Sequence, residues 1–85
     1  MAETEVGEVF QYYSKVGVAA VKITGGRLKV GDRIHFLGHT TDFTQTLESI
    51  QVEHDNVEQA EEGKSVGIKV LDRVRPADKV YLVEN

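Results

Sequence analysis

Short apolar runs that alternate with polar residues follow one another along the chain, and turn residues separate them. The runs are rich in Val, Ile, Phe, Tyr and Thr, as in "VGVAAVKI" (16–23) and "SVGIKVL" (65–71). No segment keeps a helical apolar period over the ~10 residues that a helix requires. This pattern predicts the all-β class. Because an open sheet has exposed edges, we expect a six-stranded closed, antiparallel-rich β-barrel.

The alternation also predicts where the strands lie. We expect strands over residues 6–13, 16–23, 33–38, 43–53, 65–71 and 79–84. In the run 43–53 the apolar parity changes at Glu48–Ser49, which predicts a β-bulge there. The segment 54–64 is predicted as a turn, a short extended piece and a second turn.

Glycines mark two further features of the chain. Gly31–Asp32 is predicted to be a two-residue hairpin turn, and Gly25–Gly26 to adopt positive φ where a strand ends. With 85 residues the chain is expected to be one domain, 1–85, of which residues 1–5 form a frayed tail.

Composition excludes several classes of protein. The chain has 40% hydrophobic and 28% charged residues, as expected of a soluble globular domain. No run approaches the ~18 apolar residues of a membrane span, and the acidic start lacks the features of a signal peptide. We therefore expect a cytoplasmic protein without a membrane partner. The absence of cysteine excludes disulfides and thiolate metal sites.

No motif in the sequence predicts catalysis or a cofactor. The glycines of 23–38 precede a strand and lack the order of a Walker loop, so no nucleotide cofactor is expected. His35 and His39 would lie ~13 Å apart along a strand, which disfavours a metal site. Residues 53–55, "EHD", are typical of a solvated turn. We predict a non-enzyme with no catalytic residues, no metal and no cofactor.

The charges are unevenly distributed. The net charge of −4 argues against tight sequence-independent binding to a duplex. Cations dominate residues 15–33, whereas residues 48–62 carry acids only. This distribution predicts a polarised surface. Tyr12 and Tyr13 are adjacent, so one ring is expected to point outward.

Two motifs make the chain resemble a known family. "GRLKVGDRI" (26–34) and "AEEGKSVGI" (60–68), in this order and at this spacing, resemble the second domain of the translational GTPases, the EF-Tu-like β-barrel. The resemblance covers residues 6–83 and implies a six-stranded closed barrel associated with translation and RNA. The stretch "FLGHTTDFTQTLESI" is similar to the C-terminal barrel of collagenase-like peptidase-family proteins, some of which act in RNA modification.

The resemblance also implies positions for a binding pocket. In elongation factors one end of this barrel holds the aminoacylated adenosine of tRNA, and the corresponding positions here are Gln51, Glu53, Ser65 and Lys69. Gln51 stands in place of the family's acid, and Lys69 stands where the family has an apolar residue. A charged amine is costly in an apolar pocket, so we expect that the aminoacyl-adenosine site is not retained.

Two functional hypotheses follow. The first is a freestanding, non-catalytic barrel that binds tRNA, rRNA or a ribonucleoprotein partner through cations that meet on one face. The candidate residues are Lys22, Arg27, Lys29, Arg33, Lys64, Lys69, Arg73 and Arg75. The second is a protein-interaction module that acts as the accessory subunit of a separately encoded enzyme, such as a peptidase-family RNA-modification protein; the net acidity favours this alternative.

Overall fold

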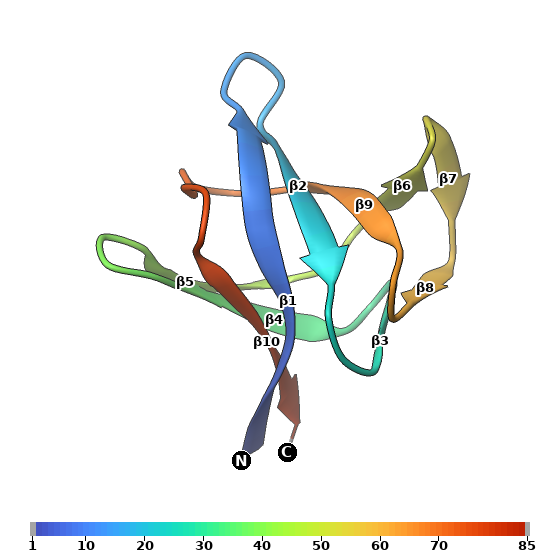
Figure 1. The fold of residues 1–85 in the computed structure, drawn as a ribbon, viewed down its shortest axis with the longest axis horizontal. Helices are drawn as coiled ribbons and strands as arrows, with labels where there is room; N and C mark the ends of the chain where they lie inside the picture. The colour runs from blue at the N-terminus through green and yellow to red at the C-terminus, as the bar shows by residue number, and fades with distance from the viewer. Residues whose placement is uncertain (1, 85) are drawn as a thin grey trace.

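The computed structural model describes residues 2–84 as an all-β fold, and it contains no helix within that range (Figure 1). The strands are β1 (Ala2–Tyr13), β2 (Val18–Ile23), β3 (Arg27–Lys29), β4 (Arg33–Leu37), β5 (Asp42–Thr46), β6 (Ile50–Val52), β7 (Asp55–Val57), β8 (Gln59–Glu61), β9 (Ser65–Lys69) and β10 (Lys79–Glu84). The predicted all-β class is therefore confirmed.

Eight strands form one curled sheet in the order β5-β4-β10-β1-β2-β9-β6-β7, and β3 pairs with β8 in a separate two-stranded ribbon. The pairs are antiparallel. The predicted number of six strands is wrong, because short strands at the corners and in the acidic segment have too few residues to show sustained alternation. The predicted closure is also not found in the strand pairing of residues 2–84, which leaves β5 and β7 at the two edges of the sheet.

A buried side chain links the edge strand β5 to the segment that follows β9. Gln45 Nε2 donates a hydrogen bond of 2.9 Å to the carbonyl oxygen of Lys69, and Gln45 Oε1 accepts one of 2.9 Å from the backbone N–H of Leu71. The Gln45 side chain thus takes the place of strand pairing between two parts of the curled sheet.

The core consists of the inward-facing residues of the strands, as the alternation predicts. In β2 the buried residues Ala19, Val21 and Ile23 alternate with more exposed ones. Phe36 is fully buried on β4, and its ring centroid lies 5.1 Å from that of Phe43 on β5. Apolar burial of this kind is the main stabilising contribution to a small domain.

The run 43–53 is not one bulged strand. It forms β5 and β6, with residues 47–49 between them outside any strand. The break occurs because β5 pairs with β4, whereas β6 pairs with β9 and β7. The change in apolar parity at Glu48–Ser49 therefore marks a change of partner strand. The acidic segment contains two short strands, β7 and β8, instead of one extended piece.

Gly31–Asp32 is not the turn of a hairpin. Gly31 has φ 102, as a tight turn requires, and Asp32 N donates to the carbonyl oxygen of Lys29 at 3.0 Å. However, β3 pairs with β8 and β4 pairs with β10 and β5, so the turn joins two different sheets. Local turn chemistry predicted the turn but could not predict the partner of each strand. The expected positive φ is found at Gly26, with φ 65.

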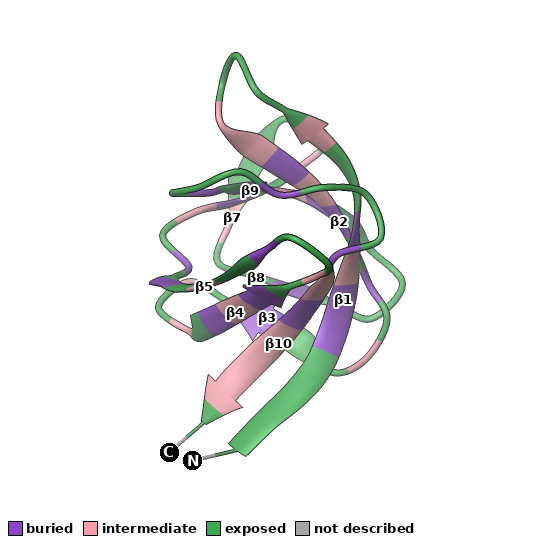
Figure 2. Ribbon diagram, turned by 90° about the vertical axis from the view of Figure 1, so that its left-hand side faces the viewer, coloured by how far each residue is buried: buried purple, intermediate pink, exposed green. Residues whose placement is uncertain are grey.

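The expected frayed tail is a strand over residues 2–5, whereas residue 1 lies outside the described residues. Ala2, Glu3, Thr4 and Glu5 pair with residues 81–84 of β10. This part of β1 is exposed, while the middle of the strand is buried (Figure 2). Backbone pairing orders these residues without the apolar burial that alternation in a sequence indicates. Within residues 2–84 no helix could span a membrane.

Candidate binding groove

Two small residues form the floor of a groove on the outer face of the sheet. Ala20 of β2 pairs with Gly67 of β9, and both residues occupy positions on the side of the sheet away from the core. A Cβ atom at Gly67 would lie 3.4 Å from Val18 Cγ1 and 3.9 Å from Gln51 Cβ. The groove above this pair has a volume of about 630 Å³ and a mostly apolar lining.

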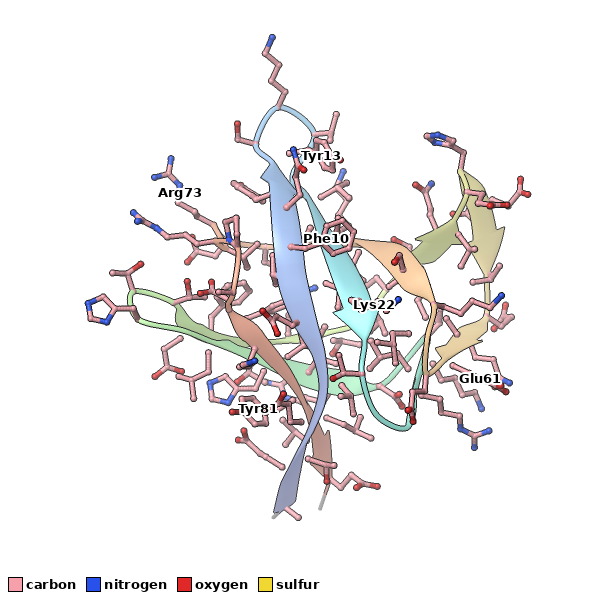
Figure 3. The ribbon with its side chains drawn as sticks, in the orientation of Figure 1. Phe10, Tyr13, Lys22, Glu61, Arg73 and Tyr81 are labelled. Carbon is pink, nitrogen blue, oxygen red and sulfur yellow. The ribbon has the colours of Figure 1, made fainter. Side chains whose placement is uncertain are left out.

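Aromatic side chains form one wall of the groove. A β-bulge in β1 leaves Phe10 unpaired between Val9, opposite Val21, and Gln11, opposite Ala20. A bulge redirects the side chain of the extra residue, and here Phe10 is 50% exposed. Tyr13, at the end of β1, is 48% exposed and lines the same groove (Figure 3). Tyr12 packs against the core, so the prediction that one of the two tyrosines points outward is confirmed.

The hairpin of β6 and β7 forms the opposite wall. Glu53 and His54 make its two-residue turn with φ 50 and 70, the backbone conformation of a tight hairpin turn. Gln51 precedes the turn and donates from Nε2 to Asn56 Oδ1 at 3.3 Å. Ser65, at the start of β9, completes the polar part of the lining. The hairpin and Ser65 together offer an amide, a carboxylate and a hydroxyl to a ligand.

Two lysines stand at opposite ends of the floor. Lys22 is paired with Ser65 and Lys69 with Val18, so four residues, or ~13 Å, separate them along the strands. Within residues 2–84 the ion pairs involve His35 and Lys79, and none involves either of these lysines. Both ammonium groups are thus available to an anionic ligand that lies along the groove.

His54 and Ser65 both line the groove, but no hydrogen bond joins their side chains in the part of the chain that the structure describes. A nucleophile needs an adjacent base within hydrogen-bonding distance. Over the same residues, no three His, Cys, Asp or Glu side chains are placed to hold a metal ion. The arrangement suits binding of a ligand with a flat apolar part and anionic ends.

The eight candidate cations do not gather on one face. Lys22 and Lys69 flank the groove, whereas Arg73 and Arg75 line two hollows near it. Figure 3 shows Arg73 far from Glu61 of β8.

The other four lie away from these sites: Arg27 is opposite Glu61 on the β3–β8 ribbon and Lys29 opposite Gln59, while Arg33 begins β4 and Lys64 precedes β9. β3 pairs with β8 and not with β4, so its cations are carried away from the groove.

Three of the four positions taken from the family pocket do come together. Gln51, Glu53 and Ser65 line the groove, while Lys69 lies at its end and outside the lining.

Phe10 was not predicted as a binding residue. The inward residues Val6, Val9 and Tyr12 are three apart instead of two, and this break in the alternation is the signal that could have revealed a bulge in β1.

Two known proteins match nearly the whole of this chain. The chain is 41% identical over 80 residues to a protein named collagenase from Porphyromonas gingivalis, a match that covers 93% of this chain and 22% of the relative. It is 40% identical over 81 residues to a protein described as an uncharacterized protease of Methanocaldococcus jannaschii. This second match covers 94% of this chain and 20% of the relative. The chain thus spans about a fifth of the length of these relatives.

A solved structure is similar over nearly its whole length. The crystal structure of the C-terminal domain of a Geobacillus thermoleovorans protein described as a U32 peptidase superposes with a TM-score of 0.87 at 25% sequence identity. The match covers 94% of this chain and 92% of that domain. The family model of elongation factor Tu domain 2 matches residues 17–73, more than half of the chain. The chain therefore belongs to the elongation factor Tu domain 2 family.

Proposed function

We propose that this chain is a non-catalytic RNA-binding module whose groove receives an unpaired segment of tRNA or rRNA. The observation that carries the proposal is the floor of Ala20 and Gly67, which lies beside exposed aromatic rings and between two lysines that form no ion pair within residues 2–84. The proposal includes a cytoplasmic location, where the cell's tRNA and ribosomal RNA are found.

The groove offers each kind of contact that an unpaired nucleotide requires. Phe10 and Tyr13 present rings on which bases can stack, and such stacking contributes about 1 to 3 kcal/mol per base. Lys22 and Lys69 can contact backbone phosphates on either side of a stacked base. Gln51 and Glu53 can bond to the edge of the base, because an amide both donates and accepts and a carboxylate accepts from an exocyclic amino group.

The charge of the chain predicts how this binding depends on salt. Two lysines of the described residues flank the groove, and the net charge of the chain is −4. A protein that neutralises two phosphates of a single strand has a slope of log K against log salt of about −1.4. We therefore expect weak, shallowly salt-dependent binding to an RNA short enough to lie within the groove.

The test is a fluorescence titration with a labelled single-stranded RNA of about ten nucleotides, within the site sizes of small β-barrels. We expect Phe10→Ala and Tyr13→Ala each to weaken binding by about 1 to 3 kcal/mol. Leu71→Ala is the matched control, because Leu71 is 75% exposed and does not line the groove. If the two aromatic variants bind as tightly as the control variant, the groove is not the RNA site.

The comparisons support a second candidate, an accessory module that docks on a peptidase-family enzyme. The matches to a collagenase, a protease and a U32 peptidase C-terminal domain each cover at least 93% of this chain. Pull-down from the chain's own cell extract, with and without nuclease, separates the candidates. A peptidase-family protein that is retained after nuclease treatment favours this second candidate, whereas loss of the captured material on nuclease treatment favours RNA.

The proposal also excludes proteolysis by the module itself. We expect the purified chain to leave gelatin uncleaved, because no hydrogen bond joins the side chains of His54 and Ser65 among residues 2–84. Cleavage that His54→Ala abolishes would contradict the non-catalytic assignment.

A further inference from the structure

Phe10 separates the groove from a second hollow. Its side chain lines the groove on one side and a hollow of about 660 Å³ on the other. The second hollow is formed by Gln11 and Tyr12 of β1 together with the loop of residues 73–76. A ligand that leaves the groove across the Phe10 ring therefore reaches this loop without leaving the surface.

Hydrogen bonds and one buried side chain hold the backbone of the loop that carries two arginines. Val74 is 1% exposed and anchors the loop in the core, so Arg73 and Arg75 on either side of it project outward. Arg75 N donates to Asp78 Oδ2 at 2.8 Å, and Asp78 N donates to the Arg75 carbonyl oxygen at 3.1 Å. Ala77 N donates to the Val9 carbonyl oxygen at 2.8 Å, which ties the loop to β1.

Neither guanidinium takes part in the ion pairs found among residues 2–84. Asp42 and Asp72 line one hollow together with both arginines, but their carboxylates form hydrogen bonds with groups other than the guanidiniums. Asp72 Oδ1 accepts from the backbone N–H of Arg73, and Asp42 Oδ1 bonds to His35 Nε2. A guanidinium presents several N–H donors in a planar fork that matches a phosphate group.

We propose that Arg73 and Arg75 hold the backbone phosphates of the RNA strand where it leaves the groove and crosses Phe10. The inference rests on the proposed function, because it extends the path of the same strand. In this arrangement the groove contacts the bases of the RNA, and the loop of residues 73–76 contacts its backbone phosphates. The length of RNA that the module binds then exceeds what the groove alone accommodates.

The test compares two single-stranded RNAs, of about four and about ten nucleotides, which span the lower range of small-barrel site sizes. In the double variant Arg73→Gln/Arg75→Gln, we expect weaker binding of the longer RNA and a salt slope shallower by about 1.4, as for two lost phosphate contacts. Binding of the shorter RNA should not change. The matched control is Arg27→Gln/Lys29→Gln, which removes the same charge from the β3–β8 ribbon and should bind both RNAs as the wild type does.

The outcomes distinguish the inference from the function on which it rests. If the arginine variant binds the longer RNA like the wild type, the proposed path is wrong although the groove remains a binding site. Equal weakening of both RNAs, or the same loss in the control variant, would also overturn the path, since it indicates a general charge effect. If the wild type binds neither RNA, the proposed function itself fails and the inference with it.

Discussion

His35 joins three strands through its two ring nitrogens. Nδ1 lies 2.8 Å from Glu3 Oε1 of β1, and Nε2 lies 2.6 Å from Asp42 Oδ1 of β5. Two carboxylates can both be satisfied only by the doubly protonated ring. The hydrogen bond to Glu3 is the main cause that raises the pKa of His35 above its ordinary value of 6.5, and burial opposes it in part.

This arrangement predicts a pH dependence of stability. Because the pKa of His35 is raised in the folded state, its contribution is complete below the unfolded value and is lost as the pH rises through the folded value. We expect the free energy of unfolding in urea to fall as the pH rises above the ordinary value of 6.5 and through the raised pKa of the folded state. His35→Gln should remove this dependence, and His54→Gln, at an exposed turn, should keep it. Equal slopes for the wild type and His35→Gln would show that another group is responsible.

Ala77 has φ 79, a conformation that glycine adopts more easily than alanine. An L-residue in this conformation raises the free energy of the folded state by about 1 to 2 kcal/mol, which glycine would relieve. Glycine also has more conformational freedom in the unfolded chain, and this lowers the free energy of unfolding by about 0.4 to 1 kcal/mol. We therefore expect Ala77→Gly to raise the free energy of unfolding by up to about 1.6 kcal/mol. The control Ala20→Gly, in the interior of strand β2, should lower it by about 0.5 to 1 kcal/mol. A loss of stability in Ala77→Gly would contradict this account of the loop.

At the scale of the elements, Gln45 decides whether the edge strand β5 stays attached to the segment after β9. Its amide makes both hydrogen bonds, to Lys69 O and from Leu71 N. Gln45→Ala leaves these groups without their partner, and we expect a loss of about 1 to 3 kcal/mol in chemical denaturation. Thr44→Ala, an exposed change on the same strand, should fall within about ±0.5 kcal/mol. Similar losses in both variants would show that the link is dispensable.

The elements also show what local sequence cannot specify. β9 and β10 were predictable because their inward residues alternate, as Val66 and Ile68 do on β9. The strand over residues 2–5 was not, because it has no buried apolar face and is ordered by pairing with β10. Likewise, "GRLKVGD" predicts a turn at Gly31, but the partner of β3 is β8, which follows about thirty residues later. Pairing between distant segments depends on the whole sheet and not on the turn.

For the whole molecule, the all-β class and the family followed from the alternation and from two motifs, and both are confirmed. The groove was predictable only in part. Gln51, Glu53 and Ser65 came from the resemblance, but Phe10 is exposed by a bulge whose position depends on how β1 pairs with β2. The expectation that eight cations share a face could not be judged from sequence, because side-chain direction depends on register and bulges.

The central claim is that the groove between Phe10 and the β6–β7 hairpin is the RNA-binding site. The most direct measurement is an NMR titration of the labelled chain with a single-stranded RNA of about four nucleotides. We predict that the amide resonances of Phe10, Tyr13, Ala20 and Gly67 shift, while those of the β3–β8 ribbon stay in place. Shifts confined to the β3–β8 ribbon, or an unchanged spectrum at saturating RNA, would contradict the claim.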